Sequence, residues 1–435
     1  MVADRLLRGM LALLAFALLA GCLSVTLPPA PSLSRVSPVG LSTDVRTLAT
    51  FHFSTPYDFV PGQKFHPLAW SQDSTGLAYT LDDSVWLLQP PNFTAKQIVN
   101  IPSSHLGEVV WSPNGENIAI GGVQFQEQVE RPFIWEVQGD GTELKDLTTK
   151  MEDASREKFI NSWVDSQTFS FTFWRGSGIQ SLYTVDITNG DTRPLIDLQD
   201  NVDIQAIGGE YYWSPDHQYI VTQGCCGGLF VTALSSLNVR ERLPGSSAPP
   251  YQAFQAWMPG GKQFLYTEPR GTESDLWSWD ISQWRGQKLF DNVLKAVPSP
   301  DGAFVALIQP ENQTWQPTIQ NQPSLLPQEP LPTLRLNILD VRSGKIQDMG
   351  NVGYSPQESS LNTQYWGAAL PVWSPDSKFL AYWDERADVW LTSRDGQWHQ
   401  PLTHGLQIVE VLWSPDGNEL ALRSFEQAWI IDKPE

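Results

Sequence analysis

A short motif that recurs along the chain constrains the fold more than any other feature of the sequence. Its last copy, LWSPDGNELAL, begins at Leu412. The tryptophan of the motif, or the residue that replaces it, falls at positions 70, 111, 163, 213, 257, 298, 373 and 413. Successive copies are therefore 41, 52, 50, 44, 41, 75 and 40 residues apart. Such a period, with several short strands in each unit, is typical of propellers and solenoids.

The chemistry of the motif explains how each unit folds. In Ser-Pro-Asp-Gly, proline presets φ at the second turn position, aspartate takes the third, and glycine adopts the left-handed conformation that closes a hairpin. The preceding tryptophan ends a strand and is a large apolar anchor. Alternation after the turn, as in ELALRS, predicts a second strand, and runs such as AWIID predict a third. We interpret the tryptophan and the aspartate as structural residues rather than ligand contacts.

The pattern W-S-P-D-G, followed by a strand and then by a strand ending in v-x-D, resembles the TolB-like, WD-repeat-like β-propeller repeat of bacterial envelope proteins. The resemblance extends from about residue 46 to the end of the chain, with departures at Gln72, Val164, Met258 and Pro298. It implies an all-β, closed β-propeller that acts as an interaction module. Eight units predict eight blades of four antiparallel strands. Seven blades is the alternative, if the weak unit around Trp163 is not independent.

The two ends of the chain are expected to meet in one blade. Seven units contain a fourth strand-like segment, whereas the last unit has none. The segment VRTLATFHFS at residues 45–54 is strand-like and lies ahead of the first motif. An unpaired strand edge promotes aggregation. We therefore expect this N-terminal strand to pair with the last blade and to close the ring.

The N-terminus has the pattern of an export signal. Arg5 and Arg8 precede the apolar run MLALLAFALLA at residues 10–20, which is short for a membrane span. The LAGC that ends at Cys22 resembles the lipobox of bacterial lipoproteins, which implies cleavage before Cys22 and lipidation of its thiol and new amino group. An uncleaved N-terminal anchor is the alternative. This pattern predicts a lipoprotein on the extracytoplasmic side of the cell envelope.

Three segments follow from these features. Residues 1–21 are the predicted signal peptide, residues 22–45 the lipidated cysteine with a Pro- and Ser-rich tether, and residues 46–435 the propeller. The 23 residues of the tether after Cys22 reach roughly 75 Å when fully extended. We therefore expect membrane contact through the lipid anchor only. The net charge of −20 argues against a nucleic-acid partner, because phosphate-backbone binders need clustered Lys and Arg.

Loop lengths predict which face of the propeller binds. In a blade with strands a to d, the a–b and c–d turns lie on one face, here called the turn face, and the b–c and d–a connections lie on the other, the loop face. The long connections at residues 148–158, 310–333 and 350–369 all belong to the loop face. Long loops in a compact domain are usually functional or disordered. We expect the loop face to bind an envelope protein; inert insertions are the alternative.

Four residues are candidates for this binding face. Trp315 lies in the Pro- and Gln-rich segment 310–333, which has the composition of a polyproline-like arm. Trp174 and Arg175 in FWRGSG, and Trp366 in QYWG, suit a sugar or peptide platform, although packing between loops explains them equally well. A small ligand, glycan or peptide bound in the axial depression is therefore the alternative function.

The stretch QGCCGGLF places Cys225 beside Cys226. With Cys22 lipidated, these two thiols have only each other within the chain. Neighbouring Cα atoms are about 3.8 Å apart, below the usual disulfide range of about 4.4 Å and more, so a ring between them would be strained. A vicinal disulfide and a pair of free thiols both remain open. A metal site is disfavoured because no histidine is nearby.

Signals for catalysis are weak. The six histidines show no metal-ligand spacing, and the chain contains neither a G-x-S-x-G elbow nor a hydrolase-sized segment outside the propeller. We expect no catalytic residues, no metal and no cofactor. A propeller-type glycosidase or lyase is kept as a second alternative, because sequence does not show which carboxylates meet across blades.

Overall fold

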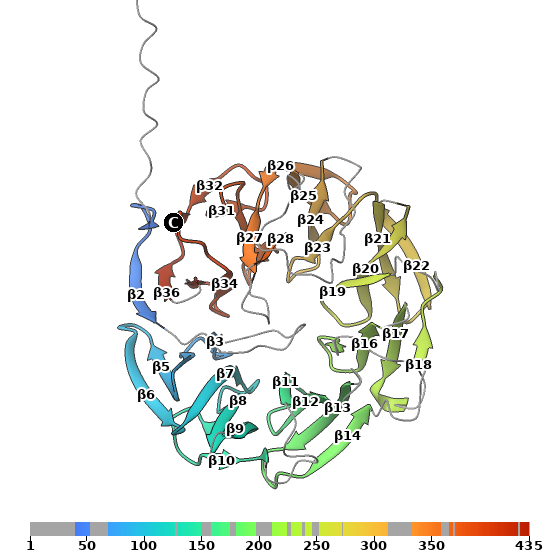
Figure 1. The fold of residues 1–435 in the computed structure, drawn as a ribbon. Coiled ribbons are helices and arrows are strands. Elements are labelled where there is room, and N and C mark those ends of the chain that lie inside the picture. The colour runs from blue at the N-terminus through green and yellow to red at the C-terminus, as the bar shows by residue number, and fades with distance from the viewer. Residues whose placement is uncertain are drawn as a thin grey trace, which may run out of the picture. The chain divides into compact units, whose positions relative to one another are not determined.

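In the computed structural model, eight four-stranded antiparallel sheets follow one another around a ring (Figure 1). The structure describes residues 40–52, 68–126, 129–148, 158–174, 180–196, 211–223, 228–236, 240–245, 252–271, 273–311, 333–357, 365–368, 370–424 and 427–434. The prediction of an eight-bladed, all-β propeller is confirmed. The seven-bladed alternative is wrong, because the unit around Trp163 forms a four-stranded blade of its own.

Each blade has its strands in chain order, apart from the last. Blade 1 contains β3 (Leu68–Trp70), β4 (Leu77–Leu81), β5 (Ser84–Gln89) and β6 (Thr94–Asn100). Blade 2 contains β7 (Ser104–Trp111), β8 (Asn117–Gln126), β9 (Val129–Gln138) and β10 (Lys145–Asp146). Blade 3 contains β11 (Lys158–Trp163), β12 (Thr168–Trp174), β13 (Gln180–Asp186) and β14 (Thr192–Ile196). Blade 4 contains β15 (Tyr211–Trp213), β16 (Tyr219–Gln223), β17 (Leu229–Ala233) and β18 (Arg240–Arg242).

The second half of the ring repeats this order. Blade 5 contains β19 (Ala253–Trp257), β20 (Gln263–Arg270), β21 (Glu273–Asp280) and β22 (Arg285–Phe290). Blade 6 contains β23 (Lys295–Pro298), β24 (Phe304–Pro310), β25 (Leu334–Asp340) and β26 (Ile346–Val352). Blade 7 contains β29 (Val372–Trp373), β30 (Phe379–Trp383), β31 (Val389–Ser393) and β32 (His399–Pro401). Blade 8 contains β34 (Glu410–Trp413), β35 (Glu419–Arg423), β36 (Gln427–Asp432) and β2 (Thr47–His52).

Two small ladders lie outside the blades. β27 (Tyr354–Gln357) and β28 (Tyr365–Ala368) form a hairpin between blades 6 and 7, within a connection that the sequence predicted only as a long loop. β1 (Gly40–Leu41) pairs with β33 (Thr403–His404). The short 3-10 helix Leu234–Ser236 follows β17. Among the described residues, no helix is long and apolar enough to cross a membrane.

Blade 8 is built from both ends of the described chain. β2 pairs antiparallel with β36, so that Thr47 lies opposite Ile431 and His52 lies opposite Gln427 (Figure 1). The ring of Phe51 in β2 also packs on the ring of Tyr79 in blade 1, with centroids 4.4 Å apart. The N-terminal strand therefore covers the edge of the last C-terminal strand and contacts the next blade as well.

The motif turns are held by a repeated set of hydrogen bonds. A buried serine hydroxyl donates to the Asp or Asn two residues later, at 2.5–2.8 Å, and accepts the N–H of the residue five positions later, at 2.9–3.0 Å. The serines are Ser71, Ser112, Ser214, Ser299, Ser374 and Ser414. Each serine therefore provides hydrogen-bond partners for the polar groups inside its own turn, as buried polar groups require.

The motif tryptophans join each blade to the one before it. The indole nitrogens of four of them donate to main-chain oxygens of the preceding blade at 2.9–3.2 Å: Trp111 to Ala69, Trp163 to Val110, Trp257 to Tyr212 and Trp373 to Val297. Trp213 donates instead to the Asn161 side chain, at 2.7 Å. The indole nitrogens of Trp70 and Trp413 are buried and have no hydrogen-bond partner among the described residues.

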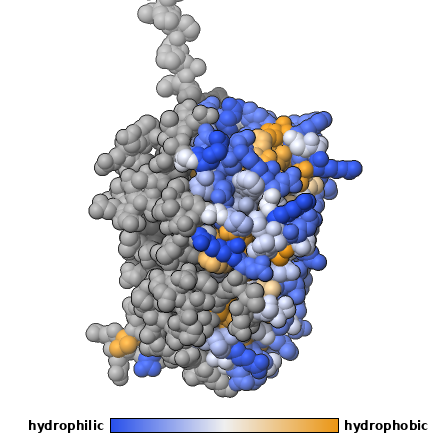
Figure 2. Space-filling view, turned by 90° about the vertical axis from the view of Figure 1, so that its right-hand side faces the viewer, coloured by the Kyte–Doolittle hydropathy of each residue, from blue (hydrophilic) through white to orange (hydrophobic). Residues whose placement is uncertain are grey.

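Apolar side chains between neighbouring sheets form the core. One cluster joins Leu77 and Tyr79 of blade 1 to Ala421 and Ile430 of blade 8, which shows that the first and last blades pack directly against each other. Burial of these faces is the main driving force for stacking the blades. The outward surface drawn in colour in Figure 2 is mainly hydrophilic, with small separate apolar patches.

Candidate functional site

Most residues that the sequence singled out for a site lie outside the described residues. This holds for Cys22, Arg175, Cys225, Cys226 and Trp315. Trp174 is the last residue of β12, and Trp366 lies in β28 opposite Pro356, but only their backbones are described. The interpretations of these residues therefore stay predictions.

A long hairpin of the loop face is described except for residues 127 and 128 at its tip. β8 and β9 are each ten residues long and form the b–c connection of blade 2. Phe125 and Val129, next to the tip, are 36% and 58% exposed. The ring of Phe125 meets the ring of His105 edge to face, with centroids 5.0 Å apart. This hairpin presents apolar side chains to solvent on the face where the sequence predicted binding.

The base of the segment 310–333 is also described. Pro310 at the end of β24 lies opposite Leu334 at the start of β25. One residue further, the Glu311 N–H donates to the Thr333 carbonyl at 2.8 Å. The chain therefore leaves the blade and returns to it at the same point, so the segment between them is an insertion in a b–c hairpin, as its sequence position predicted.

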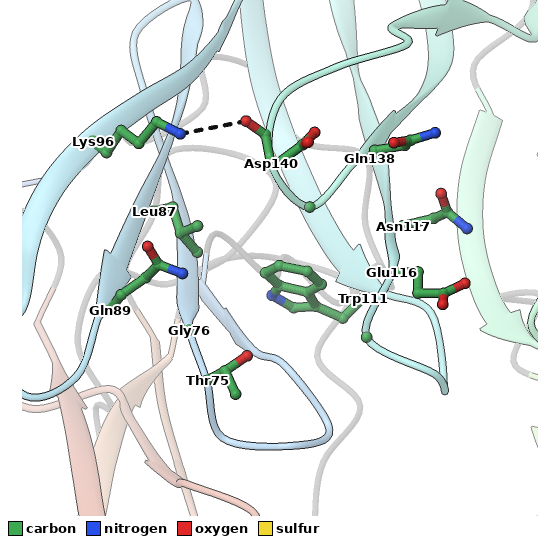
Figure 3. A pocket seen from close by; sticks show the side chains of 12 residues that line it. Thr75, Gly76, Leu87, Gln89, Lys96, Trp111, Glu116, Asn117, Gln138 and Asp140 are labelled. Atoms are coloured by element: carbon green, nitrogen blue, oxygen red, sulfur yellow. Dashed lines mark hydrogen bonds between the residues drawn. The ribbon is translucent and has the colours of Figure 1, made fainter.

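A pocket of about 600 Å³ opens on the turn face, between blades 1 and 2 (Figure 3). It is neither on the loop face nor in the axial depression, so the sequence did not predict it. Its lining residues are Thr75, Gly76, Leu87, Gln89, Lys96, Trp111, Gly115, Glu116, Asn117, Gln138, Gly139 and Asp140. Amide side chains and one large aromatic ring therefore dominate its chemistry.

Trp111 stands at the centre of this pocket. Its indole nitrogen donates to the Ala69 carbonyl at 3.0 Å, so only its ring is available to a ligand. Gln89 and Leu87 of blade 1 lie on one side of the indole in Figure 3. Above it, the ammonium of Lys96 reaches the Asp140 carbonyl oxygen at 3.5 Å.

Charges of both signs border the pocket. The Thr142 hydroxyl and backbone N–H bond to the Asp140 carboxylate at 2.6 and 2.8 Å, and they hold the pKa of that carboxyl below its usual range. Glu116 accepts a hydrogen bond from the Asn114 amide at 2.7 Å. Lys96 is the cation of the lining. Two carboxylates and one ammonium thus surround the ring of Trp111.

Buried acidic groups elsewhere are isolated or paired rather than clustered. Glu108 in β7 is fully buried and accepts the Ile160 N–H of blade 3 at 3.1 Å, and burial raises its pKa to about 8. Asp275 accepts from Lys288 at 2.6 Å and from Arg270 at 3.0 Å; burial opposes ionisation, but these cations hold its pKa below the usual range. Within the described part of the chain, no group of three or more His, Cys, Asp or Glu is placed to hold a metal ion.

Comparison of the fold with solved structures supports the propeller class. The Dos1 propeller matches with a TM-score of 0.56 and 11% identity, covering 89% of this chain and 96% of that one. The C-terminal WD40 domain of Sif2 matches at 0.51 and 12%, covering 88% and 100%. Oligogalacturonate lyase from Vibrio parahaemolyticus matches at 0.50 and 11%, covering 90% and 98%. At such identities these similarities show the fold alone.

TolB propellers are also among the similar structures. TolB from Acinetobacter baumannii matches with a TM-score of 0.37 and 15% identity, covering 77% of this chain and 78% of that one. That score is too low to carry an argument about function. The sequence matches no protein-family model, and no curated protein aligns with it. The comparisons therefore show that the fold is a β-propeller.

Proposed function

We propose that this protein is a lipid-anchored propeller of the cell envelope that binds a protein partner through its loop face. The observation that carries the proposal is the β8–β9 hairpin, which holds Phe125 and Val129 exposed on that face. Apolar side chains exposed together in a patch, rather than singly, mark interaction sites, and aromatic residues are enriched among the residues that dominate binding energy.

The two faces of the propeller differ in a way that supports this assignment. On the turn face, the motif serines and the Asp or Asn residues bond to one another and to their own backbone, so these groups are committed to structure. On the loop face, the b–c connection of blade 2 extends and the d–a connection before blade 7 forms the extra hairpin β27–β28. Variable connections on a rigid scaffold commonly carry binding residues.

Anchoring through Cys22 belongs to the same proposal. Its support is the sequence: a basic start, a short apolar run and LAGC before a Pro- and Ser-rich tether. One or more acyl chains on Cys22 would hold the protein at a membrane surface while the tether lets the propeller reach a partner away from it.

The experiment uses a photo-reactive amino acid in place of Phe125 in the full chain, expressed in its native cells. A second version carries it at Val341, which is also exposed but lies on the turn face. We expect position 125 to cross-link one defined protein and position 341 not to do so. With Cys22→Ala, the propeller should leave the membrane fraction, and its yield of cross-linked partner should fall.

Purified components then decide the assignment. The double variant Phe125→Ser/Val129→Ser should bind the captured protein at least tenfold more weakly than wild type, because it loses the apolar contact area. The matched control is Val341→Ser/Ile346→Ser on the turn face. Equal affinity of both double variants, or equal capture from both positions, would refute a partner on the loop face.

A further inference from the structure

On the turn face, two side chains fill the space between blades 6 and 7. The first is Phe304, which stands five residues after the motif serine Ser299. Its N–H donates to the Ser299 hydroxyl at 3.0 Å, and we call this place the first position. The second is Arg394, which directly follows strand c of the next blade. Its N–H donates to the Lys378 carbonyl at 2.8 Å, and we call this place the second position. The guanidinium of Arg394 lies over the ring of Phe304, 5.0 Å from its centroid.

The gap between blades 7 and 8 is closed in the same way. Phe379 takes the first position, with its N–H on Ser374 at 2.9 Å, and Lys433 takes the second, with its N–H on the Asn418 carbonyl at 2.7 Å. The Lys433 ammonium is 5.5 Å from the centroid of the Phe379 ring. A cation over an aromatic ring is a favourable filling for such a gap.

Between blades 1 and 2 both positions are glycine. Gly76 donates its N–H to Ser71 at 2.9 Å, and Gly139 donates its N–H to the Glu116 carbonyl at 2.7 Å, so these two residues correspond to Phe304 and Arg394. Two side chains fill this space between blades 6 and 7 and between blades 7 and 8. Between blades 1 and 2 the same space is the pocket of about 600 Å³ described above.

Turn geometry does not explain these two glycines. Gly115 and Gly141 nearby have φ of +70° and +92°, where glycine is favoured, but Gly76 and Gly139 are not among the residues with positive φ. Space explains them instead. A Cβ at Gly76 would stand 2.7 Å from Cδ1 of Leu87, and a Cβ at Gly139 would stand 2.8 Å from Cζ3 of Trp111.

The groups that the two glycines uncover define the chemistry of a ligand. The indole of Trp111 offers a flat apolar surface, because its nitrogen already bonds to the Ala69 carbonyl. The side-chain amides of Gln89 and Asn117 line the pocket and have no hydrogen-bond partner among the described residues. Each amide can both donate and accept. The volume lies within the range of about 300–1,000 Å³ that is usual for ligand pockets.

We propose that this pocket between blades 1 and 2 binds a neutral saccharide. The apolar C–H face of a sugar ring would pack on the indole of Trp111, and its hydroxyls would exchange hydrogen bonds with Gln89 and Asn117. Glu116 and Asp140 disfavour an anionic ligand, and Lys96 offsets one of these two carboxylates. A cationic ligand over the indole is the competing outcome that the test includes. This site lies on the turn face and does not depend on the partner proposed for the loop face.

The test is calorimetric titration of the full chain with three neutral probes: maltotriose, cellotriose and triacetylchitotriose. Trigalacturonic acid and trilysine serve as the anionic and cationic probes. We expect at least one neutral trisaccharide to bind and neither charged probe to bind more tightly. Gly76→Phe/Gly139→Arg introduces the residue types found between blades 6 and 7, and its new Cβ atoms must displace Cδ1 of Leu87 and the edge of the Trp111 ring. It should abolish binding, and circular dichroism shows whether the variant is folded.

A milder variant guards against misfolding of the filled pocket. Gln89→Ala removes one ligand hydrogen bond and should weaken binding about tenfold. Its control is Gln287→Ala, an exposed glutamine on the outer strand of blade 5. The proposal is overturned if no neutral trisaccharide binds, if a charged probe binds more tightly, if the filled variant folds and still binds, or if Gln89→Ala and Gln287→Ala bind equally.

Discussion

At the scale of single residues, Glu108 shows how burial between blades changes the chemistry of an ordinary side chain. It sits in the innermost strand of blade 2, and its carboxyl faces the backbone of blade 3. Its hydrogen bond from the Ile160 N–H does not offset the loss of water, so the pKa rises to about 8. The neutral form of Glu108 is therefore the form that the fold accommodates.

The pH dependence of stability follows from this shift. In the unfolded chain Glu108 ionises near the ordinary glutamate pKa of 4.5, whereas in the fold it ionises near 8. Below pH 4.5 Glu108 is neutral in both the folded and the unfolded state, so its ionisation does not affect stability there. As pH rises from 4.5 to 8, only the unfolded state loses the proton, and the free energy of unfolding falls by about 1.4 kcal/mol per pH unit. Glu108→Gln should remove this slope, so the variant gains stability over wild type at pH 8 but not at pH 4.5.

Urea unfolding of both proteins at several pH values between 4.5 and 8 measures the effect. Glu241→Gln, at an exposed position in β18, is the matched control and should leave the slope unchanged. If wild type and Glu108→Gln show the same pH dependence of stability, the pKa of Glu108 is not raised by burial.

At the scale of strands and turns, the motif tryptophans allow a matched comparison. Trp373 and Trp413 are both buried, at 6% and 8% exposure. The indole nitrogen of Trp373 donates to the Val297 carbonyl of the preceding blade at 3.0 Å, whereas that of Trp413 has no partner among the residues described. Replacing each by phenylalanine removes the same atoms, but only Trp373→Phe breaks an interblade bond.

We expect Trp373→Phe to lower the free energy of unfolding by about 1 kcal/mol more than Trp413→Phe, because it removes a part-buried hydrogen bond to the Val297 carbonyl. Urea unfolding monitored by circular dichroism measures both. Equal losses would mean that the interblade hydrogen bond contributes no net stability.

At the scale of the whole molecule, the ring is closed by a strand from the start of the described chain. Phe51 of β2 is 7% exposed and packs on Tyr79 of blade 1, while β2 covers the edge of β36. Phe51→Ala should cost about 3–5 kcal/mol and should expose that edge in a fraction of the molecules. We expect a lower urea midpoint and a concentration-dependent increase in mass by light scattering.

Phe125→Ala is the control for this prediction, because Phe125 is 36% exposed and lies away from blade 8. It should leave both the urea midpoint and the mass unchanged. A Phe51→Ala protein that stays monomeric and as stable as wild type would show that the N-terminal strand is dispensable for holding the ring together.

The architecture was predictable because its causes are local. The buried serine and the acid two residues later meet within one turn, and the alternation of apolar residues after the turn marks the strands. The unit around Trp163 was ambiguous in sequence, since Val164 replaces the motif serine. Its indole nevertheless bonds to Val110 as in intact units, which shows that the tryptophan keeps its place without the standard turn.

The pocket was not predictable from the motif positions alone. Its signal is present in the sequence, since Gly76 and Gly139 replace residues that carry side chains in blades 6, 7 and 8. Reading that signal requires knowing that the start of one strand b faces the end of the next blade's strand c. This correspondence joins positions 54 to 90 residues apart and comes from the stacking of blades.

The sequence by itself determined the propeller class, the turn chemistry and the strand pattern, because these depend on residues within about ten positions of one another. The choice between seven and eight blades needed the separate sheet β11–β14 of the structure. Only the tertiary structure decided which side chains meet between blades. Examples are the burial of Glu108 against Ile160, the indole nitrogens of Trp70 and Trp413 that find no acceptor in the described part of the chain, and the pocket beside Trp111. The physical reason is that each blade buries its faces only against neighbours, so the environment of those faces is set by another unit of the chain.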